Sequence, residues 1–308
     1  MTDRTADERA SARVSIIIPC LNGERYLAEA LSSALGQTHD NVEVVFIDDG
    51  STDGSLAIAR GFAQVTVLSQ PNAGVSVARN AGLDVSDGDY VLFLDADDRL
   101  APDAVRDHLD GFAAAPDAAM VYGAARIIDA AGETIGEPPA SSGYMRRAEM
   151  LFSVTPFPSQ CLFRREAVTA AGRFTPGLTM VEDYDLQLRV VGEVGLYGHG
   201  RTVCDYRRHP EQETTKLAEN LVAMLKTIDK FLPAFDDPAE RAALRRKARD
   251  TWIGFYGQYI PFEVAKCLRA GRWKRAVGAV GVYMRFLPGT AVASWRNLAA
   301  RMGRRAAG

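Results

Sequence analysis

Short apolar runs alternate with amphipathic stretches along the first hundred residues. Four runs rich in β-branched and aromatic residues resemble strands that are buried on both faces: Val14–Ile18, Val42–Ile47, Val65–Leu68 and Tyr90–Leu94. Between them, apolar residues at three- and four-residue spacing indicate helices, as over Tyr26–Leu35. This alternation predicts an α/β fold with a mostly parallel sheet and right-handed crossovers. Ligands of such sheets bind beyond the carboxyl ends of the strands.

The pattern changes after residue 117. Strands are expected over Met120–Ile128 and Gln160–Phe163, a short helix over Met145–Phe152, and another helix beginning at Glu182. From Leu217 onward the chain is expected to be mostly helical. We therefore expect a polar extension over residues 1–13, an α/β domain over 14–215 with halves 14–117 and 118–215, and a helical region over 216–308.

Charge is distributed unevenly along the 308 residues. Lys and Arg total 36 against 39 Asp and Glu, a net charge of −3 that argues against nucleic acid as a partner. From Val264 to Gly308, however, there are ten cations and no acid, which leaves 26 cations against 39 acids elsewhere, a net of −13. An acidic body with a basic tail predicts that the tail meets an anionic partner.

Cysteine spacing and hydropathy indicate the compartment. The four cysteines lie far apart without metal-like spacing, which favours reduced thiols in the cytosol. Residues 1–13 lack the apolar segment of a secretory signal, and no run approaches the ~18 apolar residues that span a bilayer. We expect a protein that is cytoplasmic or attached to a membrane surface.

Two groups of carboxylates follow two of the predicted strands. Asp95 and Asp97 are two apart directly after the fourth strand, so they can point the same way and converge on a divalent cation. The alternative is a polar turn that caps the next helix. Asp48 and Asp49 end the second strand, where a carboxylate can accept hydrogen bonds from a base or ribose, and Asp53 is expected to be the N-cap of the following helix.

Five ordered segments resemble the signature of family 2 glycosyltransferases of the GT-A fold. They are Val14–Pro19 with Asn22, Ser33–Thr38, Asp48–Asp53, Asn72–Gly74 with Ala78–Gly82, and Asp95–Asp98. The resemblance spans roughly Val14 to His209, about two thirds of the chain. It implies a Rossmann-like, mostly parallel sheet flanked by helices. It also implies inverting transfer of a sugar from a nucleotide-sugar, usually a UDP-sugar, with Mg²⁺ or Mn²⁺ as cofactor.

The resemblance also implies roles for the donor-binding residues. Pro19, Asn22 and Asp49 match the nucleotide pocket of the family, in which Asp49 reads the base. Arg79 resembles the basic residue near the ribose or diphosphate. The segment Asp95–Ala96–Asp97 resembles the DxD motif, whose two acids hold the metal beside the donor.

Two later residues complete the implied site. Asp183 of the Glu182–Asp183 pair resembles the catalytic base, although acids at the start of a helix can simply complement its dipole. His209 resembles a late histidine that approaches the diphosphate or metal, and its alternative is a surface or packing role. Leu21 stands where the family often has an aromatic residue that can stack on the base. A Gln-x-x-Arg-Trp segment is missing, and its absence disfavours a processive cellulose- or hyaluronan-type synthase.

Three rival functions differ from glycosyl transfer in the sequence features that they require. A dinucleotide-dependent dehydrogenase would need a GxGxxG turn after the first strand, where this chain has Pro19–Gly23. A nucleotidylyltransferase would have a Gly-rich, Arg/Lys-bearing first loop, which is also missing. The remaining alternative is a nucleotide-sugar or glycan-binding protein without turnover.

The C-terminal region suggests partners beyond the donor. From Lys266, cations are interleaved with large apolar residues such as Trp273 and Val277, a pattern that suits an anionic membrane surface. We expect two short interfacial helices at the inner face of the cell membrane, near a glycan or lipid-linked acceptor in polysaccharide, lipopolysaccharide or other glycoconjugate assembly. Packing on the acidic body or in a homodimer is the alternative. Aromatics from Trp252 to Phe262 are expected to pack in the core.

Overall fold

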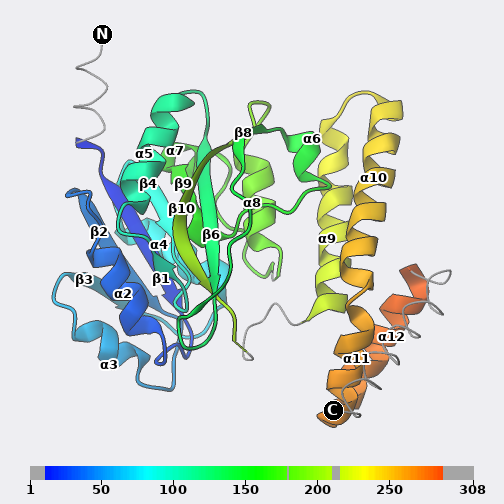
Figure 1. Ribbon diagram of the computed structural model, residues 1–308, viewed down its shortest axis with the longest axis horizontal. Coiled ribbons are helices and arrows are strands. Elements are labelled where there is room, and N and C mark those ends of the chain that lie inside the picture. The colour runs from blue at the N-terminus through cyan, green and yellow to red at the C-terminus, as the bar shows by residue number, and fades with distance from the viewer. Residues whose placement is uncertain (1–10, 179, 210–215, 287–308) are drawn as a thin grey trace. The chain divides into compact units, whose positions relative to one another are not determined.

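The computed structural model describes residues 11–178, 180–209 and 216–286, which form two compact units (Figure 1). Unit 1 comprises residues 1–150 and 154–210, and unit 2 comprises residues 151–153 and 211–308. Most of the expected polar extension over 1–13, and the basic tail from residue 287 onward, lie outside the described residues.

Unit 1 is built on one mixed sheet. Its strands follow the order β3-β2-β1-β4-β9-β6-β10-β5, with β7 paired to β6 and β8 to β10. Their bounds are β1 Val14–Cys20, β2 Val42–Asp48, β3 Val65–Ser69, β4 Tyr90–Phe93, β5 Arg99–Leu100, β6 Met120–Ile128, β7 Thr134–Gly136, β8 Ser142–Met145, β9 Cys161–Arg164 and β10 Leu196–Arg207. The first four strands are parallel, whereas β9 runs antiparallel between β4 and β6. The sheet is thus of the doubly wound type on its N-terminal side and mixed beyond β4.

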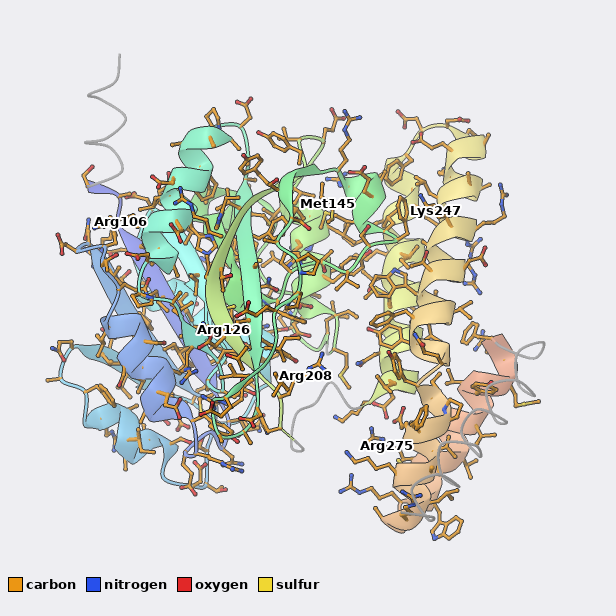
Figure 2. The ribbon with its side chains drawn as sticks, viewed as in Figure 1. Arg106, Arg126, Met145, Arg208, Lys247 and Arg275 are labelled. Carbon is orange, nitrogen blue, oxygen red and sulfur yellow. The ribbon has the colours of Figure 1, made fainter. Side chains whose placement is uncertain are left out.

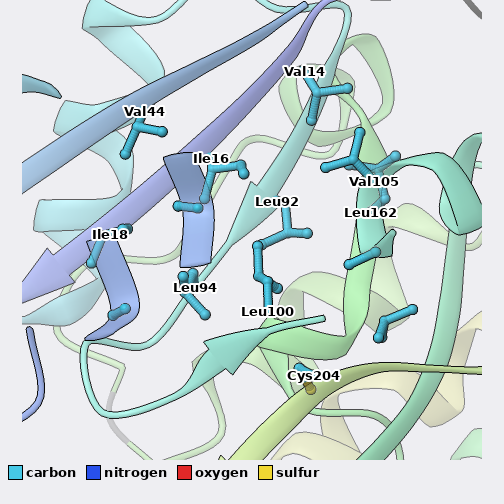
Figure 3. Packing of buried hydrophobic residues seen from close by; sticks show 14 of the residues in the cluster. Val14, Ile16, Ile18, Val44, Leu92, Leu94, Leu100, Val105, Leu162 and Cys204 are labelled. Carbon is cyan, nitrogen blue, oxygen red and sulfur yellow. The ribbon is translucent and has the colours of Figure 1, made fainter. Parts of the chain in front are cut away.

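Helices cover both faces of this sheet. Those of unit 1 are α2 Leu27–Leu35, α3 Ser55–Arg60, α4 Val75–Val85, α5 Ala104–Ala114, α6 Arg147–Met150, α7 Arg165–Ala170 and α8 Glu182–Val190, with a 3₁₀ turn η1 Pro158–Gln160. Alternate residues of β1, Val14, Ile16 and Ile18, pack with α2, α3 and α5 in the main core (Figure 3). The intervening residue Ile17 faces α4 on the other side. Burial on both faces explains why the residues of β1 form an almost continuous apolar run.

The expected elements of the first half are present, and several elements of the second half were not predicted. The four apolar runs form β1 to β4, and α2, α3 and α4 lie between them. The pattern did not indicate β5 or α5 at the end of the first half, nor β7, β8, α7 and the twelve-residue β10 of the second half. The short helix expected over Met145–Phe152 is confined to α6.

Unit 2 consists of helices α9 Leu217–Phe231, α10 Pro238–Gly257, α11 Ile260–Arg269 and α12 Trp273–Phe286, with a 3₁₀ turn at Leu232–Ala234. Asp237 caps α10 by accepting hydrogen bonds from Ala239 N and Glu240 N, and Pro238 is its first helical residue. The buried Glu263 joins three helices: its carboxylate accepts from Ala218 N of α9 and pairs at 2.8 Å with Arg275 of α12. Arg275 is labelled in Figure 2. Within the described residues, no helix is both long and apolar enough to cross a membrane.

The aromatics of α10 and α11 only partly fulfil the expected core role. Trp252 is buried, and its indole N–H donates to Leu151 O at 2.8 Å. Phe255, Tyr259 and Phe262 are instead exposed. Helical spacing alone could not separate these two situations, because it places residues on a face without telling what covers that face.

Candidate active site

The two acids at the end of β2 are buried and held by neutral donors. Asp48 accepts hydrogen bonds from Ser51 N (3.0 Å) and from the Ser69 hydroxyl (2.8 Å). Asp49 accepts from the Gln70 side chain at 2.7 Å and from the backbone N–H groups of Ala73 and Gly74, both at 2.9 Å. These carboxylates therefore hold the loop after β3 against the end of β2. A carboxylate has about four lone-pair positions, so Asp49 keeps room for one further donor.

The turn after β1 is fastened to the turn after β2. Pro19 lies in β1, and Asn22 has a left-handed backbone with φ 56°, a conformation that asparagine tolerates better than most residues. The Asn22 side-chain oxygen accepts from Thr52 N at 2.8 Å, and its own N–H donates to the Ser51 hydroxyl at 2.9 Å. Leu21, where the family often has an aromatic, is half exposed.

The expected capping role of Asp53 needs a correction. The N-cap position of α3 is occupied by Gly54, one residue later. Asp53 still contributes to the helix start, because its carboxylate accepts from Ser55 N and from the Ser55 hydroxyl. The sequence identified the helix start to within one residue.

The acids after β4 have a different environment, in which they meet charged partners. Asp95 accepts from Arg79 at 2.9 Å, and the other terminal nitrogen of Arg79 donates to Glu182 at 3.1 Å. Arg79 is 3% exposed, while the carboxyl groups of Asp95 and Asp97 remain 32% and 30% exposed. Burial and the neighbouring Asp97 raise the pKa of Asp95, although Arg79 opposes the shift. Arg79 thus connects the turn after β4 with the start of α8.

Close packing of α4 on β1 places Arg79. A Cβ atom on Gly82 would lie 2.3 Å from Ile17 Cγ2, so only glycine fits where α4 crosses β1. Asn80 donates to Phe174 O and accepts from Phe174 N, and the guanidinium of Arg79 lies 5.1 Å from the centre of the Phe174 ring. The Ala78–Gly82 segment is therefore explained by packing and by the position of one arginine.

Asp97 and His209 are in contact. His209 Nε2 lies 2.8 Å from the Asp97 carboxylate, and its ring lies 5.1 Å from that of Tyr26 in the turn before α2. Ala96 between the two acids is close to that turn as well, since a Cβ on Gly23 would lie 3.5 Å from Ala96 Cβ. The ends of β1, β4 and β10 therefore meet here.

The third acid of the turn, Asp98, is a buried anchor that sequence reasoning did not assign. It accepts from Arg207 N at 3.0 Å and from the Ser159 hydroxyl at 2.8 Å, and Asp95 N in turn donates to Ser159 Oγ at 3.2 Å. Arg207, a fully buried arginine of β10, donates to Asp97 O at 2.9 Å and pairs with Glu29 at 2.7 Å. Burial, then Asp97 and Asp95, raise the pKa of Asp98 well above its usual value. Ser159 and Arg207 thus fix the backbone of Asp95–Asp98, the acidic turn, from both sides.

Among the three acids at the start of α8, only Asp183 is not engaged with an arginine in the described residues. Glu182 pairs with Arg79, and Asp185 is buried in a pair with Arg189. Asp183 accepts one hydrogen bond, from Tyr184 N at 2.7 Å. Burial, followed by the charge of Glu182, raises the pKa of Asp183 to about 7. A carboxylate with that pKa can take a proton near neutral pH.

The predicted metal ligands lie close to one another but do not form a closed cage. Among the described residues, no three His, Cys, Asp or Glu side chains form a group that could hold a metal ion by themselves. Asp95 faces Arg79, and Asp97 faces His209. Burial first, and then the neighbouring acids, raise the pKa of Asp95 and of Asp98, so negative charge is crowded at this turn. Two carboxylates here would hold a divalent cation only together with further oxygen ligands, such as those of a bound diphosphate.

Comparison with known sequences connects this site to one family. The sequence profile described as glycosyl transferase family 2 matches residues 15–170. The chain is 35% identical over 211 residues to chondroitin synthase of Escherichia coli, which is 66% of this chain and 30% of that protein. It is 31% identical over 208 residues to hyaluronan synthase of Pasteurella multocida, 66% of this chain and 21% of that protein. The chain thus spans less than a third of the length of these two relatives. The missing Gln-x-x-Arg-Trp segment does not by itself separate it from named synthases.

Solved structures show the same fold. Residues 1–349 of TarS from Staphylococcus aureus superpose with a TM-score of 0.64 at 18% identity, over 90% of this chain and 81% of that chain. The mannosyltransferase PcManGT from Pyrobaculum calidifontis gives a TM-score of 0.62 at 18% identity, with the same coverage of 90% and 81%. Since the family profile covers half of its residues, the chain belongs to glycosyl transferase family 2 and has the GT-A fold.

Proposed function

We propose that the protein is an inverting, metal-dependent glycosyltransferase that moves a sugar from a nucleotide-sugar to a hydroxyl group of an acceptor. One observation carries the proposal. Asp183, a carboxylate with a pKa of about 7, is next to Glu182, and Glu182 is connected through an ion pair with Arg79 to Asp95 of the acidic turn. A base and a candidate diphosphate site are thereby held in one unit. The similarity to chondroitin and hyaluronan synthases supports a role in polysaccharide, lipopolysaccharide or other glycoconjugate assembly.

The donor is proposed to be a UDP-sugar bound at the ends of β1 and β2. TarS was solved in complex with UDP-GlcNAc, and PcManGT with GDP-Man and Mn²⁺, which supports nucleotide-sugar binding by this fold. Asp49 would read the base through its remaining lone pair, with Pro19 and Asn22 beside it. Asn22 is anchored to the next turn, so it would present a fixed surface to the nucleotide.

Asp95 and Asp97 are proposed to hold Mg²⁺ or Mn²⁺, with His209 as a neighbour of Asp97. The ion would act as a Lewis acid that stabilises charge developing on the leaving diphosphate. Arg79 balances the charge of Asp95 and Glu182, since each of its two terminal nitrogens pairs with one of those acids. A direct contact of Arg79 with phosphate would require one of these two bonds to be exchanged.

Asp183 is proposed as the general base. Inversion requires an acceptor hydroxyl to attack the anomeric carbon from the face opposite the leaving diphosphate. As the new C–O bond forms, the hydroxyl proton moves to the Asp183 carboxylate, which must lie within ~3 Å of that oxygen. Glu182 and Asp185 are less suited, because each is held by an arginine.

The acceptor is proposed to be a glycan or a lipid-linked glycan on the cytoplasmic side of the membrane. A homodimer stays compatible with the proposal, because the proposed base, metal ligands and nucleotide pocket all come from unit 1 of one chain.

The proposal is tested by incubating the purified chain with a panel of UDP- and GDP-sugars and candidate glycan acceptors, in Mn²⁺ or in EDTA. We expect nucleotide release and a glycosylated product in Mn²⁺ only, and ¹H NMR of that product should show the anomeric configuration opposite to that of the donor. Donor binding without turnover across the panel would favour the alternative of a non-catalytic nucleotide-sugar-binding protein. A product with retained configuration would contradict the inverting mechanism.

A further inference from the structure

Helix α12 has an apolar stripe that the described residues leave uncovered. Its members recur every three or four residues, so they lie on one side of the helix: Trp273, Val277, Val280 and Met284, which are 65%, 70%, 37% and 57% exposed. An adjacent side, about 100° around the helix, carries the buried residues Ala276, Ala279 and Tyr283, where α12 contacts α11 and α9. The helix is therefore apolar on two sides, of which only one is packed.

Such a stripe differs from ordinary surface leucines and valines. Single exposed apolar residues are normal, whereas a contiguous patch marks an interaction site. Phe262 and Leu268 of the neighbouring α11 are also exposed, at 37% and 40%. The 14 residues of α12 are too few to cross a bilayer but suffice for a helix that lies in a membrane interface.

The charges of the segment that carries the stripe all have one sign. Residues 264 to 286 contain no acid, and the exposed cations among them are Lys266, Arg269, Arg272, Lys274 and Arg285. The sixth cation, Arg275, neutralises the buried Glu263. Lys274 and Arg285 each follow a stripe residue directly, about 100° around the helix from it. Their long stems can lie beside the stripe while the charges reach anionic groups at the edge.

We propose that the stripe on α12, together with the five exposed cations of α11, α12 and the turn between them, binds the surface of an anionic lipid bilayer. Trp273, Val277, Val280 and Met284 enter the acyl boundary, and the cations contact the headgroups. A second copy of this chain is a poorer occupant, because the same cationic surface would face itself. A nucleic acid would leave the apolar stripe exposed to water. The inference is independent of the catalytic proposal.

The test uses the full chain with vesicles of phosphatidylcholine, with and without phosphatidylglycerol. The protein is expected to sediment with the anionic vesicles, and raised salt should weaken binding, because headgroup attraction is screened. The double variant Val277→Ser/Met284→Ser should reduce the partition coefficient at least tenfold without changing the melting temperature, since both side chains are exposed. The charge variant Lys274→Glu/Arg285→Glu should abolish the preference for anionic vesicles.

A matched control replaces exposed apolar residues of unit 1, Val85→Ser and Ile135→Ser, which are 45% and 57% exposed. This control should bind vesicles as the parent does. Substitutions within α12 are used because truncation would also remove residues beyond the described helix. The proposal is overturned if the parent does not bind anionic vesicles, or if both α12 variants bind as well as the control. It is also overturned if the variants change only the oligomeric state in analytical ultracentrifugation, which would identify a second copy as the occupant.

Discussion

Two groups of aspartates lie at the ends of β2 and β4, the two strands that flank β1 in the sheet, yet their surroundings differ in kind. At the end of β2, Asp48 and Asp49 are buried and receive hydrogen bonds from hydroxyl, amide and backbone N–H groups. At the end of β4, Asp95 and Asp97 are each about a third exposed and face a guanidinium and an imidazole. Burial and mutual repulsion raise the pKa of Asp95 and of Asp98 in this second group.

The difference separates acids that meet neutral hydrogen-bond donors from acids that meet other charged groups. Neutral donors occupy most of the lone pairs of the β2 acids, so these acids fasten loops, and Asp49 keeps one position for a further donor. After burial, mutual repulsion adds to the raised pKa of Asp95 and of Asp98, and a bound cation would relieve that repulsion. The same sequence signal, acids after an apolar strand, thus precedes two different environments.

The largest effect is expected from Asp97→Ala. The variant should lose metal-dependent donor binding and with it all measurable transfer, because one of the two proposed ligands is gone. Calorimetric titration of a nucleotide-sugar in Mn²⁺ and in EDTA measures this. Its counterpart in the other group, Asp48→Asn, should retain the difference between Mn²⁺ and EDTA. Equal binding by Asp97→Ala and the parent in both buffers would show that the β4 acids do not hold the metal.

The pH dependence of turnover reports on the base. Burial and Glu182 raise the pKa of Asp183 to about 7, and a base must be deprotonated to act. Turnover should therefore approach a tenfold fall per pH unit below that value, or about 50-fold between pH 7 and pH 5. Initial rates at saturating donor and Mn²⁺ measure it, with donor affinity at each pH as the control. A flat profile from pH 5 to 8 would exclude Asp183 as the base.

Ser159→Ala is expected to have a smaller effect. The hydroxyl joins the carboxylate of Asp98 to the backbone of Asp95 and touches no proposed ligand atom. Loss of such an outer contact typically costs about 10–100-fold in metal affinity or activity. Mn²⁺ titration of activity should show a raised half-saturation value, which Ser159→Thr, retaining the hydroxyl, partly restores. Unchanged Mn²⁺ dependence in the alanine variant would mean that the turn is held without Ser159.

The smallest effects concern stability, and they should have opposite signs for Asp48 of the β2 group and for Asp183 at the start of α8. Asp48→Asn replaces a carboxylate that accepts two hydrogen bonds, so it should destabilise the fold by about 1 kcal/mol. Asp183→Asn should stabilise it above pH 7 by about 1–3 kcal/mol, because the folded state raises the pKa of Asp183 and so disfavours its charged form.

The sign follows from proton binding. Between the unfolded pKa near 4 and the folded value of about 7, the folded protein holds an extra proton, so its stability falls as pH rises through this range. The gain from Asp183→Asn should accordingly vanish at pH 4. Urea unfolding of both variants at pH 4 and pH 8 measures this. Destabilisation by Asp183→Asn at both pH values would contradict the raised pKa.

The sequence predicted the N-terminal half of unit 1, because the patterns that define its strands and helices lie within short stretches of sequence. The apolar runs of β1 to β4 and the acids that follow them lie within a few residues of one another, and periodicity detects such patterns. Periodicity did not detect β10. Gly198 and Gly200 interrupt the alternation of that strand, and its pairing with β6 shifts register between Gly198 and Thr202, so no local pattern predicts it.

In the candidate site, the residues that lie within motifs were predictable, whereas their contact partners elsewhere in the sequence were not. Resemblance singled out Arg79 as a partner of the diphosphate, yet its partners in the fold are Asp95, 16 residues away, and Glu182, 103 residues away. Ser159 and Arg207 hold the acidic turn from 61 and 109 residues beyond Asp98. Such pairs come from tertiary packing, and no spacing rule within one sequence encodes them.

Turnover of Asp183→Asn tests the central claim most directly. The substitution keeps the size of the side chain and removes its ability to take a proton, while the metal ligands and nucleotide pocket stay intact. With donor, acceptor and Mn²⁺ saturating, we expect transfer to fall by about 10²–10⁴-fold while the dissociation constant of the donor stays within about twofold of the parent. Transfer at the parental rate would contradict the account, since the proton of the acceptor would then leave by another group.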